Sequence, residues 1–256
     1  MSATTVLLAR TGRAEWGRVW SVRSSWIFAL VTAVAVVGLG TIIGFDSADD
    51  PSGVPADVSA WDGGRLTGMF ALFGILAMSV VASTADYGTG GIVPTLQWTP
   101  RRGVLVAART GVIVATTTLL GVLLVAAASV VVWACLPELG LPVSEGAETL
   151  GGLGLVYACG AVLAVGLGLL LRSTAGGLVS VIALVLVLPP LLAQLPYDWA
   201  VEISAHMPGS AALYLIFGEG PSDDMTTAST RLTLGAWAVT ALSAGGLRLL
   251  RTDANR

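Results

Sequence analysis

The sequence predicts an all-α membrane protein with six transmembrane helices, and three observations support this prediction. Hydrophobic residues make up 55% of the 256 residues and charged residues only 11%, less than half of the charged share of a soluble domain. Six apolar stretches contain no ionisable residue, and a backbone in lipid satisfies its hydrogen bonds as a helix. The basic residues gather in alternate connections between these stretches, as the positive-inside rule requires.

The N-terminal segment, residues 4–25, is too polar to enter the membrane. As a helix it places Trp16 and Trp20 on an apolar side, and Arg13 and Arg23 at the borders of that side, where their stems reach the polar surface. The opposite face holds Arg10, Arg18, Ser21 and Ser25. We expect an interfacial helix along the inner leaflet. It serves either as a topology anchor or as a contact for a cytoplasmic partner, and periodicity does not separate these two roles.

The transmembrane helices follow in order, and we expect both ends of the chain in the cytoplasm. The expected helices are residues 27–45, 68–84, 110–136, 151–171, 175–195 and 232–250. Connections on the inner side carry 11 Arg and 3 acidic residues, a net charge of +8. Those on the outer side carry Arg65 and Arg231 against 13 acidic residues, a net charge of −11. The positive-inside rule therefore places both termini inside.

Two outer connections are long enough to have structure of their own. Residues 46–67 are acidic and contain two prolines, so we expect them to be irregular and solvated. Residues 196–231 should contain short helices, because residues 209–217 are apolar but too few to cross a bilayer. This segment predicts a re-entrant or interfacial element over the outer mouth of a pathway. The residues assigned to this external gate are Pro208, Leu213, Tyr214 and Phe217.

Small residues and prolines mark special positions within the spans. Gly40 and Gly44 form a GxxxG pair, which either brings two helices close together or reflects the high usage of small residues. Gly160, Ala164 and Gly168 repeat the same spacing. Adjacent prolines, Pro189 and Pro190, should kink or end the fifth span and free backbone carbonyls.

The composition excludes several classes of function. The chain contains no Lys, so it has neither a Walker A loop nor a Schiff-base lysine. A single His and two distant Cys provide no metal or haem ligand cluster, and we expect no catalytic residue and no bound cofactor. The centres of the spans lack the ionisable groups of ion-coupled transporters and the motifs of intramembrane proteases. Two classes of function remain: a conduit that is powered by another chain, and a membrane protein that does not transport.

Four segments, in order along nearly the whole chain, resemble the ABC-2 type exporter permeases of high-GC Gram-positive bacteria. They are EWGRVWSVRSSW (15–26), ADYGTGGIVPTLQWTPRRGVLVAAR (85–109), LLLRSTAGGLVSVIALVLVLPPLLAQLP (169–196) and MPGSAALYLIF (207–217). The resemblance implies that the loop 85–102 forms a coupling helix seated in a cytoplasmic ATPase subunit. It also implies two ATPase copies, which hold the ATP and Mg²⁺, and a second permease subunit in a homodimer or heterodimer.

The first part of this loop departs from the family pattern. Asp86 stands where the family has Glu, Tyr87 matches the aromatic residue, and Gly88 replaces the usual Arg. Because that Arg is a multidentate donor for acidic partners, the contact should depend on other residues, or the chain pairs with a different permease. The residues assigned to coupling are Asp86, Tyr87, Thr89, Leu96, Trp98, Arg101 and Arg102.

The resemblance implies a permease subunit of an ATP-driven exporter in the cytoplasmic membrane of a bacterium. The apolar spans favour a hydrophobic or amphipathic substrate such as a drug, an antibiotic or a lipid, with membrane lipids as partners and no nucleic acid. The alternative is a non-transporting immunity, anchor or sensor protein. We expect the second and fifth spans at the axis of a dimer. The residues assigned to this pathway are Phe70, Phe73 and Met78, on one side of the second span, and Val185, Pro189 and Pro190.

Overall fold

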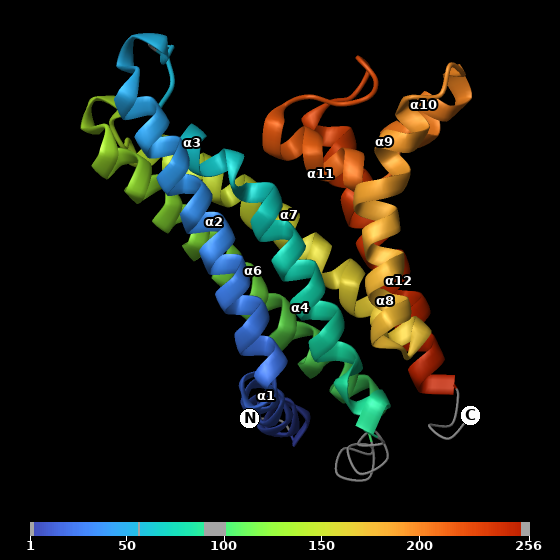
Figure 1. The fold of residues 1–256 in the computed structure, drawn as a ribbon. Coiled ribbons are helices and arrows are strands. Elements are labelled where there is room, and N and C mark those ends of the chain that lie inside the picture. Colours follow the sequence, from blue (N-terminus) through green and yellow to red (C-terminus); the bar gives the residue numbers. More distant parts are fainter. Residues whose placement is uncertain (1–2, 56, 90–100, 252–256) are drawn as a thin grey trace.

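The computed structural model describes residues 3–55, 57–89 and 101–251, and these residues form helices joined by short connections (Figure 1). In this part of the chain, six helices are long and apolar enough to cross a membrane, which confirms the predicted fold class at that level. They are α2 (Arg23–Asp49), α4 (Gly68–Thr89), α6 (Arg102–Cys135), α7 (Val143–Leu171), the composite of α8 and α9 (Thr174–Ala193) and α12 (Thr227–Arg251).

The helices form two arms that diverge from the end of the molecule where both termini lie, which we call the terminal end (Figure 1). One arm contains α2, α4 and α6, and the other contains the composite of α8 and α9 together with α12. Helix α7 joins the arms, because it packs on α4 and α6 and also on α12. Shorter helices lie at the opposite end: α3 (Ala60–Leu66), α10 (Asp198–Ala205) and α11 (Pro208–Phe217).

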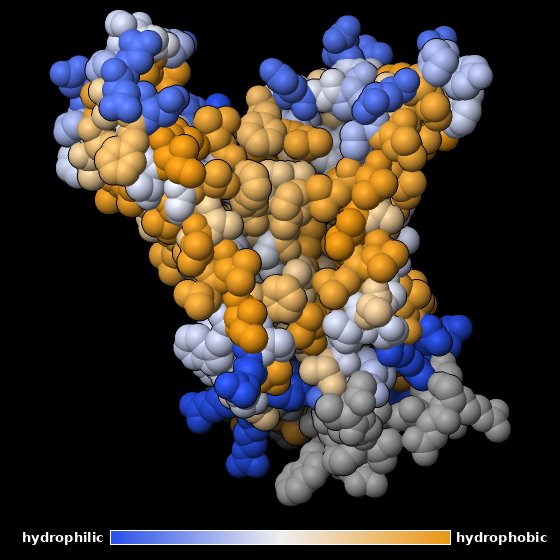
Figure 2. Space-filling model, viewed as in Figure 1, coloured by the Kyte–Doolittle hydropathy of each residue, from blue (hydrophilic) through white to orange (hydrophobic). Residues whose placement is uncertain are grey.

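The surface between the two ends is apolar. Figure 2 shows an apolar band across the face in view, with hydrophilic residues above and below it. The exposed side chains of α2 include Leu30, Val34 and Ile42. Such exposure in water would be costly, whereas lipid accepts it, so the surface agrees with a multi-pass membrane protein.

The first boundary in the chain differs from the expected one. Helix α1 (Ala3–Ser21) ends before residue 25, and α2 begins at Arg23. Val22 between them is extended, with φ −89° and ψ 123°. Arg23 and Ser25 therefore belong to the first membrane helix and not to the N-terminal segment.

The expectation that residues 46–67 are irregular throughout is wrong. Helix α2 continues to Asp49, and α3 packs on α6. Ser59 and Asp62 form a capping box at the start of α3, and the buried indole of Trp61 donates a hydrogen bond to the carbonyl of Pro142 at 2.9 Å. A Cβ at Gly64 would overlap Ser129 of α6. The small residue Gly64 thus lets a short helix lie directly on its neighbour.

Small residues bring the membrane helices into close contact, which is one of the two alternatives that the spacing of Gly40 and Gly44 left open. A Cβ on Gly40 would lie 2.8 Å from Ala128, and one on Gly44 would lie 2.9 Å from the sulfur of Cys135. These two glycines of α2 therefore form its contact with α6. In α7, a Cβ on Gly166 would overlap the backbone of α12 at Ala241. Such close approach increases dispersion contact, which helps membrane helices to associate.

The fifth span is broken beside the proline pair, as predicted. Helix α8 (Thr174–Ile182) passes into a π-helical turn (Ala183–Val187) and then into α9 (Leu188–Ala193). Pro189 has no N–H for the carbonyl of Val185, four residues earlier. A Cβ on Gly209, at the start of α11, would overlap that carbonyl. The break thus creates the surface on which α11 rests.

We expect Gly166→Ala to lower the stability of the bundle by about 1–3 kcal/mol, because the added methyl group forces α7 and α12 apart. The measurement is the midpoint of thermal unfolding of the purified protein in detergent. Gly151→Ala, in the same helix but with no neighbouring atom within 4 Å of its Cβ, is the matched control. It should be neutral or stabilising, because Ala favours a helix. Equal midpoints for the two variants would contradict the close contact.

Candidate functional site

Four charged side chains from three helices meet near the terminal end. They are Glu15 and Arg18 of α1, Asp86 of α4 and Arg109 of α6, which we call the ionic cluster. Arg109 is only 1% exposed. Its Nη2 donates to Asp86 at 2.7 Å, and its Nε and Nη2 donate to the two carboxylate oxygens of Glu15 at 3.3 Å. A buried guanidinium is thus held between two carboxylates.

Arg18 completes the ionic cluster. Its guanidinium pairs with Glu15 at 2.7 Å and also with Asp86. Burial and the neighbouring charge of Arg109 lower the pKa of Arg18 below its ordinary value, and the two carboxylates offset only part of this effect. Arginine remains protonated at neutral pH in either case. Two cations therefore face two anions, and the cluster carries no net charge.

The ionic cluster corrects the orientation expected for α1. Thr11, Glu15 and Val19 recur every four residues and form its buried face, and the helix packs on α6. Arg18, which the sequence assigned to the polar face, instead reaches Asp86 of α4. Arg13 and Arg23 are exposed. Charge pairing with the bundle decides which side of α1 faces inward.

Three tryptophans mark the corner between α1 and α2. The rings of Trp16 and Trp20 lie 6.1 Å apart, and those of Trp20 and Trp26 lie 4.9 Å apart. The indole N–H of Trp26 donates to the carbonyl of Trp20 at 2.9 Å. Trp16 and Trp26 are exposed, which suits amphipathic rings at a membrane interface.

The structure distributes the residues assigned to coupling over different environments. Asp86 belongs to the ionic cluster, and the guanidinium of Arg172 lies 5.9 Å from the ring centre of Tyr87. Thr89 is the last residue of α4, whereas Leu96 and Trp98 lie outside the described residues.

The adjacent arginines of this connection have different surroundings. Arg101 is exposed and immediately precedes α6. Arg102 donates at 3.1 Å to the carbonyl of Leu249, near the end of α12. Carbonyls at a helix C-terminus lack intrahelical donors and favour cations. Arg102 therefore joins α6 to α12, and Arg101 is the more exposed of the two arginines.

The assignment of Met78 to the pathway face of α4, together with Phe70 and Phe73, is wrong. Phe70 is 46% exposed, and its ring packs edge-on against the half-buried Phe73 at 6.4 Å. Met78 is only 1% exposed and packs with Val19 and Ile113 in the core. Each helical residue turns the direction of its side chain by about 100°. Met78 follows Phe73 by five residues, so the two side chains differ by about 140° and Met78 points away from Phe73.

The fifth span needs a similar correction. The side chain of Val185, expected along the pathway, is buried in the core of this chain. It therefore does not present a surface to a second subunit. Pro189 is buried as well, whereas Pro190 is exposed.

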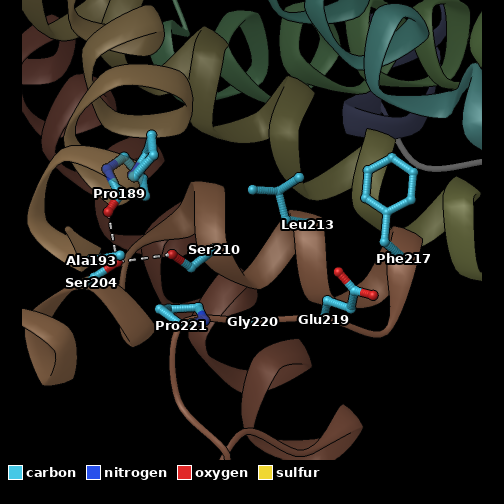
Figure 3. Close-up of a pocket in the computed structure, with 10 residues that line it drawn as sticks. Pro189, Ala193, Ser204, Ser210, Leu213, Phe217, Glu219, Gly220 and Pro221 are labelled. Atoms are coloured by element: carbon cyan, nitrogen blue, oxygen red, sulfur yellow. Dashed lines mark hydrogen bonds between the residues drawn. The ribbon is translucent and has the colours of Figure 1, made fainter.

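Residues assigned to the outer gate meet the proline pair at a cavity of about 340 Å³ (Figure 3). Leu213 and Phe217 of α11 line it together with Pro189 and Pro190. The hydroxyl of Ser204 donates to the carbonyl of Pro189 at 2.8 Å and joins α10 to this wall. Pro208 is buried at the start of α11, and Tyr214 lines a second cavity that also includes Phe217.

Sequence reasoning missed the ionic cluster, although the charge count contained a signal. Only 3 acidic residues occur among the connections assigned to the inner side, and Glu15 and Asp86 are two of them. Isolated acids among many arginines are natural partners for a buried arginine.

Within the described residues, no group of three or more His, Cys, Asp or Glu side chains is placed to hold a metal ion. The sequence matches no protein-family model, and no protein of curated function shows significant similarity to it.

We expect Arg109→Met to lower the free energy of unfolding by about 3–5 kcal/mol, because it removes the buried cation between two carboxylates and leaves Glu15 and Asp86 with Arg18 alone. The readout is the thermal midpoint in detergent. Arg13→Met changes an exposed arginine of α1 and should leave the midpoint unchanged. If the two variants were equally stable, the ionic cluster would not hold α1 on the bundle.

Proposed function

We propose that this chain is the permease subunit of an ATP-driven exporter of the ABC-2 type. It moves a hydrophobic or amphipathic substrate outward across the cytoplasmic membrane of a bacterium. The observation that carries the proposal is the attachment of Asp86, at the entry to the connection 85–102, to Arg18 and Arg109. Because these partners belong to α1 and α6, a force on the connection reaches two further helices. This arrangement suits a segment pushed by an ATPase subunit.

In this proposal the terminal end faces the cytoplasm, where two ATPase subunits bind. They hold the ATP and Mg²⁺, because this chain contains no Lys for a Walker A loop. As the ATPase subunits dimerise, they displace the connection 85–102. Separating a buried ion pair costs about 3–5 kcal/mol, so α1 and the start of α6 move together with Asp86.

The opposite end provides the exit. A π turn interrupts the fifth span beside Pro189, and such turns often occur at functional positions. The neighbouring cavity is bounded by apolar side chains, including Pro190, Leu213 and Phe217. We infer that the substrate leaves beside this cavity as α9 bends relative to α8.

A second permease subunit, either identical or related, completes the pathway. Phe70, which is exposed, and Phe73, which is half-buried, remain candidates for its lining in α4. Aromatic rings offer large apolar contact areas with little conformational entropy to lose. Met78 and Val185 are no longer candidates, because both side chains are buried in their own subunit.

Association with an ATPase tests the proposal directly. The purified chain alone should bind no ATP, whereas co-expression with its proposed ATPase partner should yield a complex that hydrolyses ATP. Arg101→Glu should weaken the complex at least tenfold, because a reversed charge then meets an acidic partner surface. Arg23→Glu, at an exposed arginine of the same end, is the control, and both variants should keep the wild-type thermal midpoint. Specific ATP binding by the isolated chain would refute the proposal.

Cysteine labelling tests the orientation. In a variant without Cys135 and Cys159, single cysteines at Ser52, Glu145 and Asp223 should react with an impermeant reagent in intact cells. Cysteines at Ser21, Thr99 and Asn255 should react only after lysis. External labelling at Thr99 would invert the topology and exclude coupling to a cytoplasmic ATPase.

A further inference from the structure

The two arginines of the otherwise acidic outer connections line the same cavity. These connections hold 13 acidic residues, and their only basic residues are Arg65 and Arg231. The two arginines are distant in sequence and belong to α3 and α12. Both border a cavity of about 350 Å³. Positive charge at this end of the molecule is therefore concentrated in one place.

The arginines of this cavity are available to a ligand. Arg65 is 42% exposed in its side chain and pairs with Asp62 at 2.9 Å through one nitrogen, Nη2. Its guanidinium therefore has further donors. Arg231 is exposed and forms no ion pair within the described part of the chain. Glu148 is the only carboxylate among the lining residues, and Asp62 offsets part of the charge of Arg65 from outside the lining, so Arg231 is the arginine without a paired carboxylate in the described part of the chain.

Apolar side chains from α7 and α11 form part of the cavity wall, beside Thr149 and Thr227. Leu153 and Ile216 are buried at its wall, and Tyr214 and Phe217 add aromatic surface. Ligand sites commonly combine apolar walls with a few placed polar groups, in volumes of about 300–1,000 Å³. A small inorganic anion would contact the arginines and leave the apolar walls unused. An uncharged apolar molecule would leave the arginines unused.

We propose that this cavity binds an anionic amphiphile. Its phosphate or carboxylate head lies between Arg65 and Arg231, whose planar guanidinium groups bind such anions through paired hydrogen bonds. Its hydrocarbon tail packs against the walls that include Leu153 and Phe217. The inference goes beyond the proposed transport, because binding requires neither an ATPase nor any movement. The same chemistry occurs in an anionic lipid of the outer leaflet and in a free anionic surfactant.

The test is native mass spectrometry of the full-length chain in an uncharged detergent, without any ATPase. One copy of dodecyl phosphate, and likewise one copy of laurate, should bind to the wild-type protein. Inorganic phosphate lacks the tail and glycerol monolaurate lacks the charge, so each should bind at least tenfold more weakly. Wild-type protein that bound glycerol monolaurate as tightly as dodecyl phosphate would overturn the proposal.

Three variants test the assigned residues. The double variant Arg65→Gln/Arg231→Gln should lose at least tenfold in affinity for dodecyl phosphate. Arg251→Gln, at an exposed arginine near the other end of α12, is the matched control and should bind as the wild type does. Glu148→Gln should bind several times more tightly, because it removes the carboxylate that opposes the ligand. Unchanged affinity in the double variant, or weaker binding in Glu148→Gln, would overturn the proposal.

Competition identifies the source of the ligand. Displacement of dodecyl phosphate by phosphatidylglycerol would support an anionic lipid of the bilayer as the occupant. Retention of dodecyl phosphate would support a free amphiphile as the occupant. Because no step of the assay involves transport, failure of the exporter proposal would leave this result intact.

Discussion

The buried charge of Arg109 is the constraint on which the terminal end of the structure depends. Removing an arginine from water costs several kcal/mol unless carboxylates compensate it. Asp86 supplies one carboxylate from α4, and Glu15 supplies the other from α1. A helix that composition alone places in the membrane interface is therefore a packed part of the bundle. Arg18 strengthens this attachment, since it contacts both carboxylates.

Elsewhere the bundle is held by close backbone approach. Gly166 lets α7 touch α12, while Gly40 and Gly44 let α2 touch α6. Such contacts require an accurate fit, because lipid tails provide no hydrophobic driving force between helices. Helix α7 makes such contacts with both arms, which diverge toward the end opposite the termini (Figure 1). The cavity with the two arginines lies at that end, among α3, α7, α11 and α12.

Helix α11 connects the two cavities of that end with the break in the fifth span. Gly209 rests on the carbonyl that Pro189 leaves without its helical donor. Phe217, at the other end of α11, lines both the apolar cavity and the cavity with the two arginines. A change in the angle between α8 and α9 would therefore move α11 and alter the shape of both cavities. This links the proposed exit for the substrate with the proposed site for an anionic amphiphile.

Composition and periodicity determined the class of fold, the six membrane helices and the break at Pro189 and Pro190, because these follow from local chemistry. A backbone in lipid forms helices wherever enough apolar residues follow one another, and proline removes a donor in any context. The small-residue pattern of α2 left a helix contact and plain composition as alternatives, and the structure contains the contact.

Tertiary structure alone decided which charges are buried and which side of each helix faces inward. Arg109 pairs with Asp86, 23 residues earlier in the sequence, and with Glu15, 94 residues earlier. No local sequence pattern encodes pairing over such separations. Met78 was assigned to the wrong side of α4, because an apolar residue is equally suited to lipid and to a core. Arg65 and Arg231 share a cavity only because α3 and α12 meet α11 at the same end. Long-range packing, and not local propensity, brings these side chains together.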